Sequence, residues 1–402
     1  MTKILHGLPE KVTFCKRCVM SNQRPSTTPE HIKSSTNIKT AEFDENGICH
    51  ACLFSDFKKK INWNEREKQF EELLAKYRTK NSSYDVLVPG SGGKDSIFVS
   101  HLLKYKYNMK PLTITWAPHI YTDIGFKNMQ SWIHSGFDNI LFTPNGMTHS
   151  KLTKIAFEKL CNPFQPFIIG QKLLMIRLAK QFGIKLIMYG ENQAEYHNKL
   201  SDNQSSEMKP DFFSRDKLDK NEIKIAGHSV KNLIDDFNFK LEDLENYIPL
   251  DRQEIDELDI NVHYTSYFTK WIPQEAYYYA VKNARFEPNP YGRSEGTYSK
   301  YASLDDKTDG FNYYTMFIKF GQGRATNDAA HEIRDGHLTR DEGVSLVRKF
   351  DGEFPKLYFQ DFLNYININQ ENFFEIIDKN RSPHLWKKNN LTNKWELLHQ
   401  VT

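Results

Sequence analysis

The sequence has no apolar run long enough to span a bilayer, and its first residues, Met1 to Val12, contain no seven-residue apolar stretch of the kind found in export signals. We therefore expect a soluble, cytoplasmic protein with no membrane partner. A large excess of basic residues is also absent, since 54 Lys and Arg stand against 51 Asp and Glu, for a formal net charge of +3. Proteins that bind nucleic acids usually carry a strongly basic face, so this balance does not support a nucleic-acid partner.

A chain without enough apolar residues stays disordered, but this one has ample material for a core. Of its 402 residues, 39% are apolar and 13% are aromatic. The length fits two or three compact units, and we expect one catalytic domain with appendages.

Cysteine is scarce, but its placement is informative. Four of the five cysteines form two Cys-x-x-Cys pairs, Cys15 with Cys18 and Cys49 with Cys52. In a chain without an export signal, such pairs favour a metal over disulfides, and two of them complete a tetrahedral Zn²⁺ site. A redox pair or unliganded thiols are the alternatives. We expect a structural zinc ribbon with a closed coordination sphere, so His50 is not needed as a ligand.

After the ribbon, apolar segments with strand and helix periodicity alternate. This alternation predicts an α/β fold with a parallel sheet and helices on both faces. Ligands of such folds bind beyond the carboxyl ends of the strands, so function is expected in the loops after Val88, Trp116 and Tyr189. The expected strands are 86–88, 112–116, 140–142 and 185–189, and the expected helices are 65–80, 97–105, 125–135 and two within 151–182.

The segment Pro89 to Ser96, Pro-Gly-Ser-Gly-Gly-Lys-Asp-Ser, directly follows the first expected strand and opens a helix. Glycines let the backbone approach phosphate oxygens, and the free amides of a helix N-terminus bind anions. The spacing does not fit the Gly-x4-Gly-Lys-Ser/Thr loop of ordinary NTPases. A glycine-rich turn with a capping serine is the alternative, but the flanking strand and helix favour a phosphate site.

The Ser-Gly-Gly-x-Asp-Ser form resembles the PP-loop of ATP pyrophosphatases, whose domain is of the adenine nucleotide alpha hydrolase type. This resemblance implies ATP and Mg²⁺ as cofactors, with ATP cleaved between its α and β phosphates. The implied roles are phosphate binding by Ser91, Gly92, Gly93 and Ser96, added positive charge from Lys94, and a contribution to Mg²⁺ binding by Asp95.

A second group of candidate residues follows other expected strands. Glu191 and Glu195 lie where they could reach the α-phosphate, the metal or the substrate, and we name them with Lys94 and Asp95 as candidate catalytic residues. Both glutamates could instead be solvated carboxylates near a helix start. Candidate ATP contacts are Gly190, Asn192, Thr115 and Trp116. Only the family pattern places Thr115 and Trp116 near adenine, and Trp116 could instead be a core residue.

The ribbon, the loop, the Tyr-Gly-Glu-Asn segment 189–192 and the block Arg293 to Thr326 together resemble N-acetyl sugar amidotransferases, over about Cys15 to Pro355. That family makes acetamidino groups on bacterial surface sugars, which include pseudaminic, legionaminic and mannuronic acid derivatives of lipopolysaccharide and flagellin glycans. Along the chain we expect four domains: a zinc ribbon at 1–62, an ATP-binding α/β domain at 63–197, a polar insertion or lid at 198–260, and a mostly helical substrate-binding region at 261–402.

The implied reaction is attack of the acetamido oxygen on the α-phosphate, followed by displacement of AMP by ammonia from an O-adenylyl imidate. Neither step needs a protein nucleophile, so positioning and electrostatics supply most of the catalysis. Surface charge and ordinary core packing are the alternative roles for the candidate substrate-binding residues, which are His197, Arg293, Glu295, Tyr298, Lys300 and Arg324.

A glutaminase site is missing from the sequence. Glutamine hydrolysis of the class I type needs a cysteine on a glycine-flanked elbow, but Cys161 precedes Asn162-Pro163 and has no such glycines. We expect Cys161 to be buried and ammonia to come from a partner glutaminase or from solution. One alternative is a PP-loop tRNA-modifying enzyme of the thiolation or lysidine type, but the single Cys161 and the low net charge argue against it. The other is a non-catalytic ATP-binding protein, and the intact loop argues against that.

Overall fold

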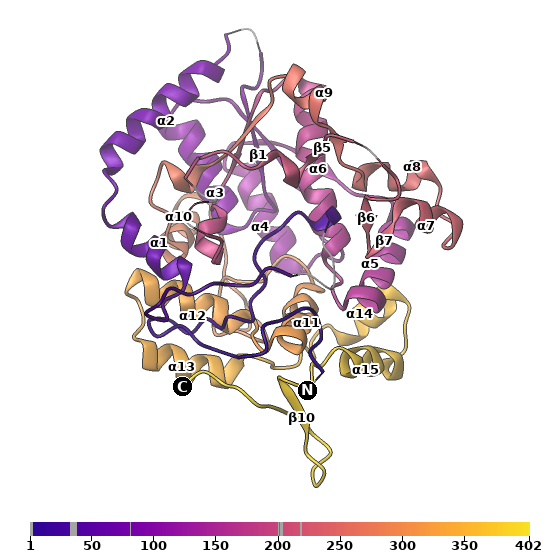
Figure 1. Ribbon diagram of the computed structural model, residues 1–402. Helices are drawn as coiled ribbons and strands as arrows, with labels where there is room; N and C mark the ends of the chain where they lie inside the picture. The colour runs from indigo at the N-terminus through magenta and orange to yellow at the C-terminus, as the bar shows by residue number, and fades with distance from the viewer. Residues whose placement is uncertain (1–2, 33–37, 81, 200, 202–203, 218) are drawn as a thin grey trace.

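The computed structural model describes residues 3–32, 38–80, 82–199, 201, 204–217 and 219–402 (Figure 1). Its centre is a five-stranded sheet with the order β3-β2-β1-β4-β9, in which every neighbouring pair is parallel. The four strands expected from the sequence are confirmed, and β9 was not foreseen. The bounds are β1 (Val86–Pro89), β2 (Pro111–Trp116), β3 (Asp138–Phe142), β4 (Leu186–Tyr189) and β9 (Asn261–Tyr264).

Side chains of the central strands alternate between two apolar layers, as the pleat of a strand requires. Leu87 of β1 packs in a core with α5 (Gly146–Leu160) and α6 (Gln165–Phe182). Val86 and Val88 point the other way and pack with residues of α2 (Trp63–Tyr77) and α3 (Lys94–His101). The prediction of helices on both faces of the sheet is therefore confirmed.

The helix starts follow their capping residues. The Asn62 side chain accepts a hydrogen bond from the Glu65 amide at the start of α2, and Thr122 does the same for Gly125 at the start of α4 (Asp123–His134). Helix α3 begins at Lys94, three residues earlier than expected, and continues into a π-helical turn at Leu102–Lys106.

The polar composition of the segment 198–260 indicated an insertion or lid, but several of its described residues are buried in the core. Its apolar residues are far apart among charges, yet Phe213, Ile225, Leu233 and Tyr247 are buried in the same core as Leu87. The segment is thus part of the body of the α/β unit. Its elements are η5 (Pro210–Phe212), β5 (Ser214–Arg215), β6 (Lys224–Ile225), β7 (His228–Ser229), α7 (Val230–Asp235), α8 (Leu241–Leu244), η6 (Glu245–Tyr247), β8 (Leu250–Asp251) and α9 (Arg252–Glu257).

The C-terminal region is mostly helical, as expected, and the N-terminal ribbon crosses it in the lower half of Figure 1, where both chain ends lie. Apolar residues of α12 and α13, such as Ala329 and Val347, share one core with the ribbon cysteines. The elements are α10 (Pro273–Ala284), α11 (Asp309–Phe320), α12 (Arg324–Asp335), α13 (Arg340–Phe350), α14 (Phe359–Ile366), α15 (Gln370–Lys379) and an antiparallel hairpin of β10 (Trp386–Lys388) and β11 (Trp395–Leu397).

Within the described residues, none of the helices combines the length and apolar character needed to cross a membrane.

Candidate functional site

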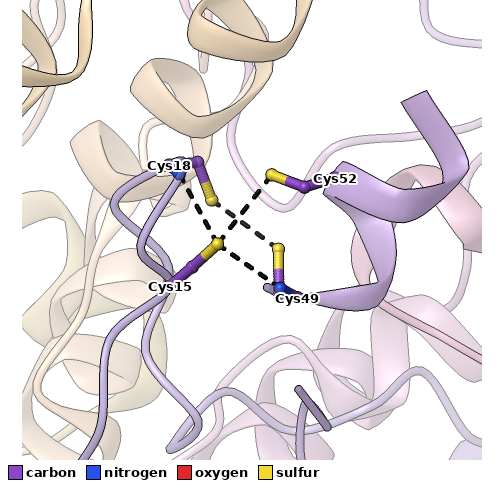
Figure 2. A group of neighbouring side chains, drawn as sticks. All are labelled: Cys15, Cys18, Cys49 and Cys52. Carbon is purple, nitrogen blue, oxygen red and sulfur yellow. Dashed lines mark hydrogen bonds between the residues drawn. The ribbon is translucent and has the colours of Figure 1, made fainter. Parts of the chain in front are cut away.

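The four paired cysteines converge at one buried point beside α1 (His50–Lys58) (Figure 2). Their sulfur atoms all lie within 4.8 Å of one another, with 3.9 Å between the sulfurs of Cys15 and Cys52 and 3.7 Å between those of Cys18 and Cys49. Four Zn–S bonds of about 2.3 Å at tetrahedral angles separate sulfurs by about 3.8 Å. The cluster therefore fits a metal such as zinc, which would hold the ribbon together structurally.

Cations and amides around the cluster offset the charge of the thiolates. The amides of Arg17 and Cys49 donate to the Cys15 sulfur at 3.4 and 3.3 Å. Burial by itself would lower the pKa of the Arg334 guanidinium. The negative charges of the neighbouring cysteines, chiefly Cys18, outweigh burial and hold this pKa above its usual value. These contacts favour the deprotonated sulfurs that a metal requires.

The predicted phosphate loop spans the turn from β1 to α3, and its Gly90 and Gly92 are closely packed. Gly92 has φ +85°, and a Cβ there would lie 2.5 Å from the Cα of Met129 in α4. Gly93 is the N-cap of α3, so no side chain caps the first amides of that helix. Uncapped amides at a helix N-terminus are suited to binding an anion such as phosphate.

The loop lies at the point where the strand order reverses. The chain runs from β1 outward to β2 and β3, then returns to place β4 on the other side of β1. Crevices at such points bind ligands at the carboxyl ends of the strands. The loop after β1 and the segment Gly190 to Asn192 after β4 therefore share one end of the sheet.

Two carboxylates lie beside the loop. Asp95 accepts a hydrogen bond from the Trp271 indole nitrogen at 2.9 Å and pairs with the Lys94 ammonium at 2.5 Å. Glu191 accepts from the Tyr196 hydroxyl at 2.9 Å. Burial raises the pKa of Glu191, and the negative charge of Asp95 raises it further. Two carboxylates that repel each other in this way fit a divalent cation such as Mg²⁺.

Several polar side chains around these carboxylates lie deep in the protein, and we call this group of residues the recess. Burial is the largest cause of the raised pKa of Glu191, Asp305 and Asp309, and it brings that of Asp309 to about 7. Each of these side chains nevertheless keeps some contact with solvent, so they line a recess and are not part of a packed core. Other deep, partly accessible polar residues are Tyr196, Tyr301, Tyr313 and Arg324.

The C-terminal region supplies one wall of the recess. Arg324 opens α12, ion-pairs with Asp328 at 3.1 Å and donates to the Tyr313 hydroxyl. The Lys94 ammonium lies 5.5 Å from the centre of the Tyr301 ring. The Ser91 side chain of the loop is near enough to Asp305 to oppose the rise of the pKa of that carboxyl on burial. Residues near position 300 and beyond thus face the phosphate loop directly.

A cleft of about 550 Å³ lies next to this wall and contains two of the predicted substrate-binding residues, Arg293 and Glu295. Arg293 forms a two-pronged ion pair with Glu353, at 2.6 and 2.9 Å. Asp306 lines the cleft while its neighbour Asp305 contacts the loop, so the recess and the cleft lie on two sides of one short segment.

Other predicted site residues lie apart from the loop. Thr115 and Trp116 are buried in β2, and the Trp116 ring packs against Gly170 of α6. The amide of Asn192 donates to Ser266, and its side chain accepts from Ala194, so both groups shape the turn after β4. His197 is 3% exposed. These positions are internal, and the adenine wall at Thr115 and Trp116 remains a prediction from the family pattern.

The remaining candidates make contacts of their own. Glu195 is buried against Lys58 of α1, with 2.6 Å between the ammonium and the carboxylate. Tyr298 donates to Glu332 at 2.9 Å, and the exposed Lys300 lies over the ring of Tyr277. Of the predicted residues, the structure therefore groups the loop with Glu191 and Arg324, and places Glu195 at the contact with the ribbon.

Sequence reasoning missed Trp271, Asp305 and Asp309 as residues beside the loop. Asp305 and Asp309 belong to an acidic run just after the block 293–301, which was a usable signal. Trp271 stands in an aromatic-rich segment, and its contact with Asp95 spans 176 residues of sequence. No local pattern marks such a contact.

The buried pair of Lys58 and Glu195 gives a stability prediction. Lys58→Met leaves the Glu195 carboxylate buried without its cation, so we expect the free energy of unfolding to fall by about 3 kcal/mol. Denaturant unfolding measures this change. Lys59→Met is the matched control, because the neighbouring Lys59 side chain is 71% exposed. Equal effects of the two variants would show that the pair does not stabilise the fold.

Comparison with known proteins identifies the C-terminal part of the chain. Residues 295–402 match the family described as the C-terminal domain of WbpG-like lipopolysaccharide biosynthesis proteins. The uncharacterised protein MJ1599 of Methanocaldococcus jannaschii is 30% identical over 83 residues, which are 21% of this chain and 30% of that protein. The chain therefore matches less than a third of the length of this relative.

Among solved structures, the U34-tRNA thiolase NcsA from Methanococcus maripaludis, determined with its 4Fe-4S cluster, matches 81% of this chain and 86% of its own, at 12% identity and a TM-score of 0.27. A TM-score of 0.27 is too low to support an inference about fold or function. The family match is more informative, because residues 295–402 include Asp305, Asp309 and Arg324, which line the recess. Residues that match this family thus lie near a glycine-rich loop at the end of a parallel sheet.

Proposed function

We propose that this chain is an ATP-dependent amidotransferase that converts an acetamido group of a bacterial surface sugar into an acetamidino group and forms AMP and pyrophosphate. The observation that carries the proposal is the recess that two parts of the chain share. The Ser91–Ser96 loop, with Asp95, lies on one side, and Arg324, from the residues that match the WbpG-like family, lies on the other. In this proposal the loop activates the nucleotide, and residues that match the lipopolysaccharide-biosynthesis family bind the sugar.

The loop would bind ATP through the phosphates. The first amides of α3 and the hydroxyls of Ser91 and Ser96 would bind the pyrophosphate part, and Lys94 would offset its charge. Asp95 and Glu191 would hold Mg²⁺, which when bound withdraws charge from the phosphate oxygens. Since Trp271 already orients the Asp95 carboxylate, little rearrangement is needed when the metal and nucleotide enter.

The sugar would react from the side of the C-terminal wall. Its acetamido oxygen attacks the α-phosphorus, the bond to the bridging oxygen breaks, and pyrophosphate leaves an O-adenylyl imidate that carries the amide proton. Ammonia then adds to the imidate carbon, the C–O bond breaks, AMP leaves, and the acetamidinium product keeps the positive charge. Tyr301 and Arg324 would orient the sugar, because Tyr301 lies beside Lys94 of the loop and Arg324 is near enough to act on Tyr301. No protein nucleophile takes part.

A partner glutaminase would supply the ammonia. Cys161, the cysteine outside the ribbon, is fully buried in an apolar cluster, and burial raises the pKa of its thiol to about 11. A thiol that stays protonated and enclosed cannot attack glutamine. The chain would therefore receive ammonia made elsewhere.

Cys161→Ala should accordingly leave ammonia-dependent amidination within about twofold of the wild-type rate, because the thiol has no chemical role. Steady-state rates with ammonium and with glutamine measure the effect, and glutamine alone should be a poor donor for both proteins. A wild-type chain that uses glutamine as well as ammonia, together with a variant that loses only the glutamine reaction, would refute the two-protein arrangement.

The function itself is tested by mass spectrometry of products formed from ATP, an ammonium salt and a panel of acetamido sugars. We expect AMP, pyrophosphate and a sugar product in which NH has replaced O. Transfer RNA is included as an alternative substrate in the same assay. AMP formation that depends on tRNA and not on any acetamido sugar would overturn the proposal.

A further inference from the structure

Arg24 is a buried arginine of the N-terminal ribbon, and the recess residues Tyr196, Tyr313 and Arg324 are near enough to act on its charge. Its backbone is fixed, because its amide donates to Ser21 at 3.3 Å and its carbonyl accepts from Ala41 at 2.7 Å. Its side chain, 9% exposed, reaches α12, where it donates to the side chain of Asn327. The ribbon therefore places this guanidinium firmly.

This guanidinium has unused hydrogen-bonding capacity. Among the described residues, no group accepts a hydrogen bond from its Nε atom. The charged neighbours that act on it include two more cations, Arg324 and Arg334, and burial lowers its pKa to about 10. At neutral pH the side chain is thus still protonated. A buried cation without a counter-charge is costly, and proteins usually keep one for a ligand.

The surroundings of Arg24 connect it to the proposed reaction site. Its guanidinium carbon lies 6.0 Å from the centre of the Tyr196 ring, and the Tyr196 hydroxyl donates to Glu191. His197 follows Tyr196 and is 3% exposed, and neither of its ring nitrogens has a hydrogen-bond partner in the part of the chain that the structure describes. Among the described residues, the Arg24 Nε atom and both ring nitrogens of His197 are therefore left without hydrogen-bond partners, and Arg24 is near enough to act on the charge of His197.

Arg324 is less available than Arg24 for a new anion. It already pairs with Asp328 at 3.1 Å and bonds to Tyr313. The other nearby cation, Arg334, donates to the Glu195 carbonyl at 3.1 Å and lies among the ribbon thiolates. Of these three arginines, Arg24 is the one for which the described residues supply no carboxylate partner.

We propose that Arg24 binds an anionic group, a carboxylate or a phosphate, on the acetamido sugar, with His197 donating a second hydrogen bond. This inference rests on the proposed function for the identity of the ligand. The substrate would supply the counter-charge that the fold omits, and the planar guanidinium is suited to two-pronged binding of either group. The ribbon would then select the substrate as well as stabilise the fold.

The test compares three forms of one sugar by calorimetric binding to the full-length zinc-loaded protein: neutral N-acetylglucosamine, its uronic acid and its 1-phosphate. We expect the wild type to prefer at least one acidic form. Arg24→Gln should weaken binding of that form by about 10- to 100-fold and that of the neutral sugar by less than about twofold. Arg24→Lys should recover part of the loss, and the uronic acid and phosphate arms identify the anion.

Arg17→Gln is the matched control, because Arg17 is also in the ribbon but its ion pair with Asp56 is exposed. It should leave the preference unchanged. A wild type that binds the three sugars equally or binds none, or an Arg24→Gln variant that keeps the preference at an unchanged melting temperature, would overturn the inference. If acidic sugars bind through Arg24 but release no AMP, the proposed reaction is wrong and the anion site stands.

Discussion

Asp95→Asn is expected to abolish Mg²⁺-dependent AMP formation while the protein stays folded. The substitution keeps the shape of the side chain and an oxygen that can accept from Trp271, which donates to Asp95 at 2.9 Å. It removes the negative charge that, with Glu191, would hold the metal against the phosphates. Loss of one such electrostatic contribution costs about 100-fold or more in turnover. Release of AMP and pyrophosphate, followed across a Mg²⁺ titration, measures this loss.

Asp341→Asn provides the control for this variant. Asp341 also lies in the first turn of a helix, α13, but it is exposed and outside the recess. Its substitution should change neither turnover nor melting temperature appreciably. Two results would count against the assignment: an Asp95→Asn enzyme with wild-type turnover, or a wild-type enzyme whose first products are ADP and orthophosphate.

Removal of the metal is expected to unfold the ribbon and destabilise the whole chain. Binding of structural zinc contributes about 10–16 kcal/mol in small zinc domains, whereas a typical domain is stable by only about 5–15 kcal/mol. Cys49→Ser should therefore prevent stable folding, and a chelator should lower the melting temperature of the wild type sharply. The effect should extend beyond the ribbon, because Ala329 and Val347 of the C-terminal helices share its core. Circular dichroism with and without chelator measures both effects.

His50→Ala is the control for the metal prediction. His50 adjoins Cys49 but is not part of the sulfur cluster, so its removal should leave metal content unchanged. Metal analysis of the purified protein should find one zinc ion per chain. Less than one ion, or a melting temperature that a chelator does not change, would contradict the structural role.

The features predicted correctly from the sequence are those encoded by local patterns. The strand 86–88, the helix that follows it and the glycines between them carry their own periodicity and turn chemistry, so this strand, turn and helix were predicted from their residues alone. The ribbon cysteines were found in the same way, because a metal site of this type repeats a short spacing.

The features that were missed depend on contacts between distant segments. Strand β9, Asn-Val-His-Tyr, lacks the unbroken apolar run that marks β1 and β4, and it becomes a strand by pairing with β4. Glu195 was expected near the phosphates, but Lys58, 137 residues away in sequence, holds it at the ribbon. Apolar residues such as Phe213 and Tyr247 were hidden among charges and enter the core only after the chain has folded back. Spacing along the chain carries no information about these encounters.

The core that the ribbon shares with α12 and α13 constrains the order of events during synthesis. The cysteines between 15 and 52 leave the ribosome early, while Ala329 and Val347, which cover them, are made near the end. Contacts between such distant segments form late, and apolar surface that waits for its partner is prone to aggregation. We expect nascent chains that end before about residue 335 to depend on chaperones. In such chains the C-terminal helices that cover the apolar residues of the ribbon have not yet been made.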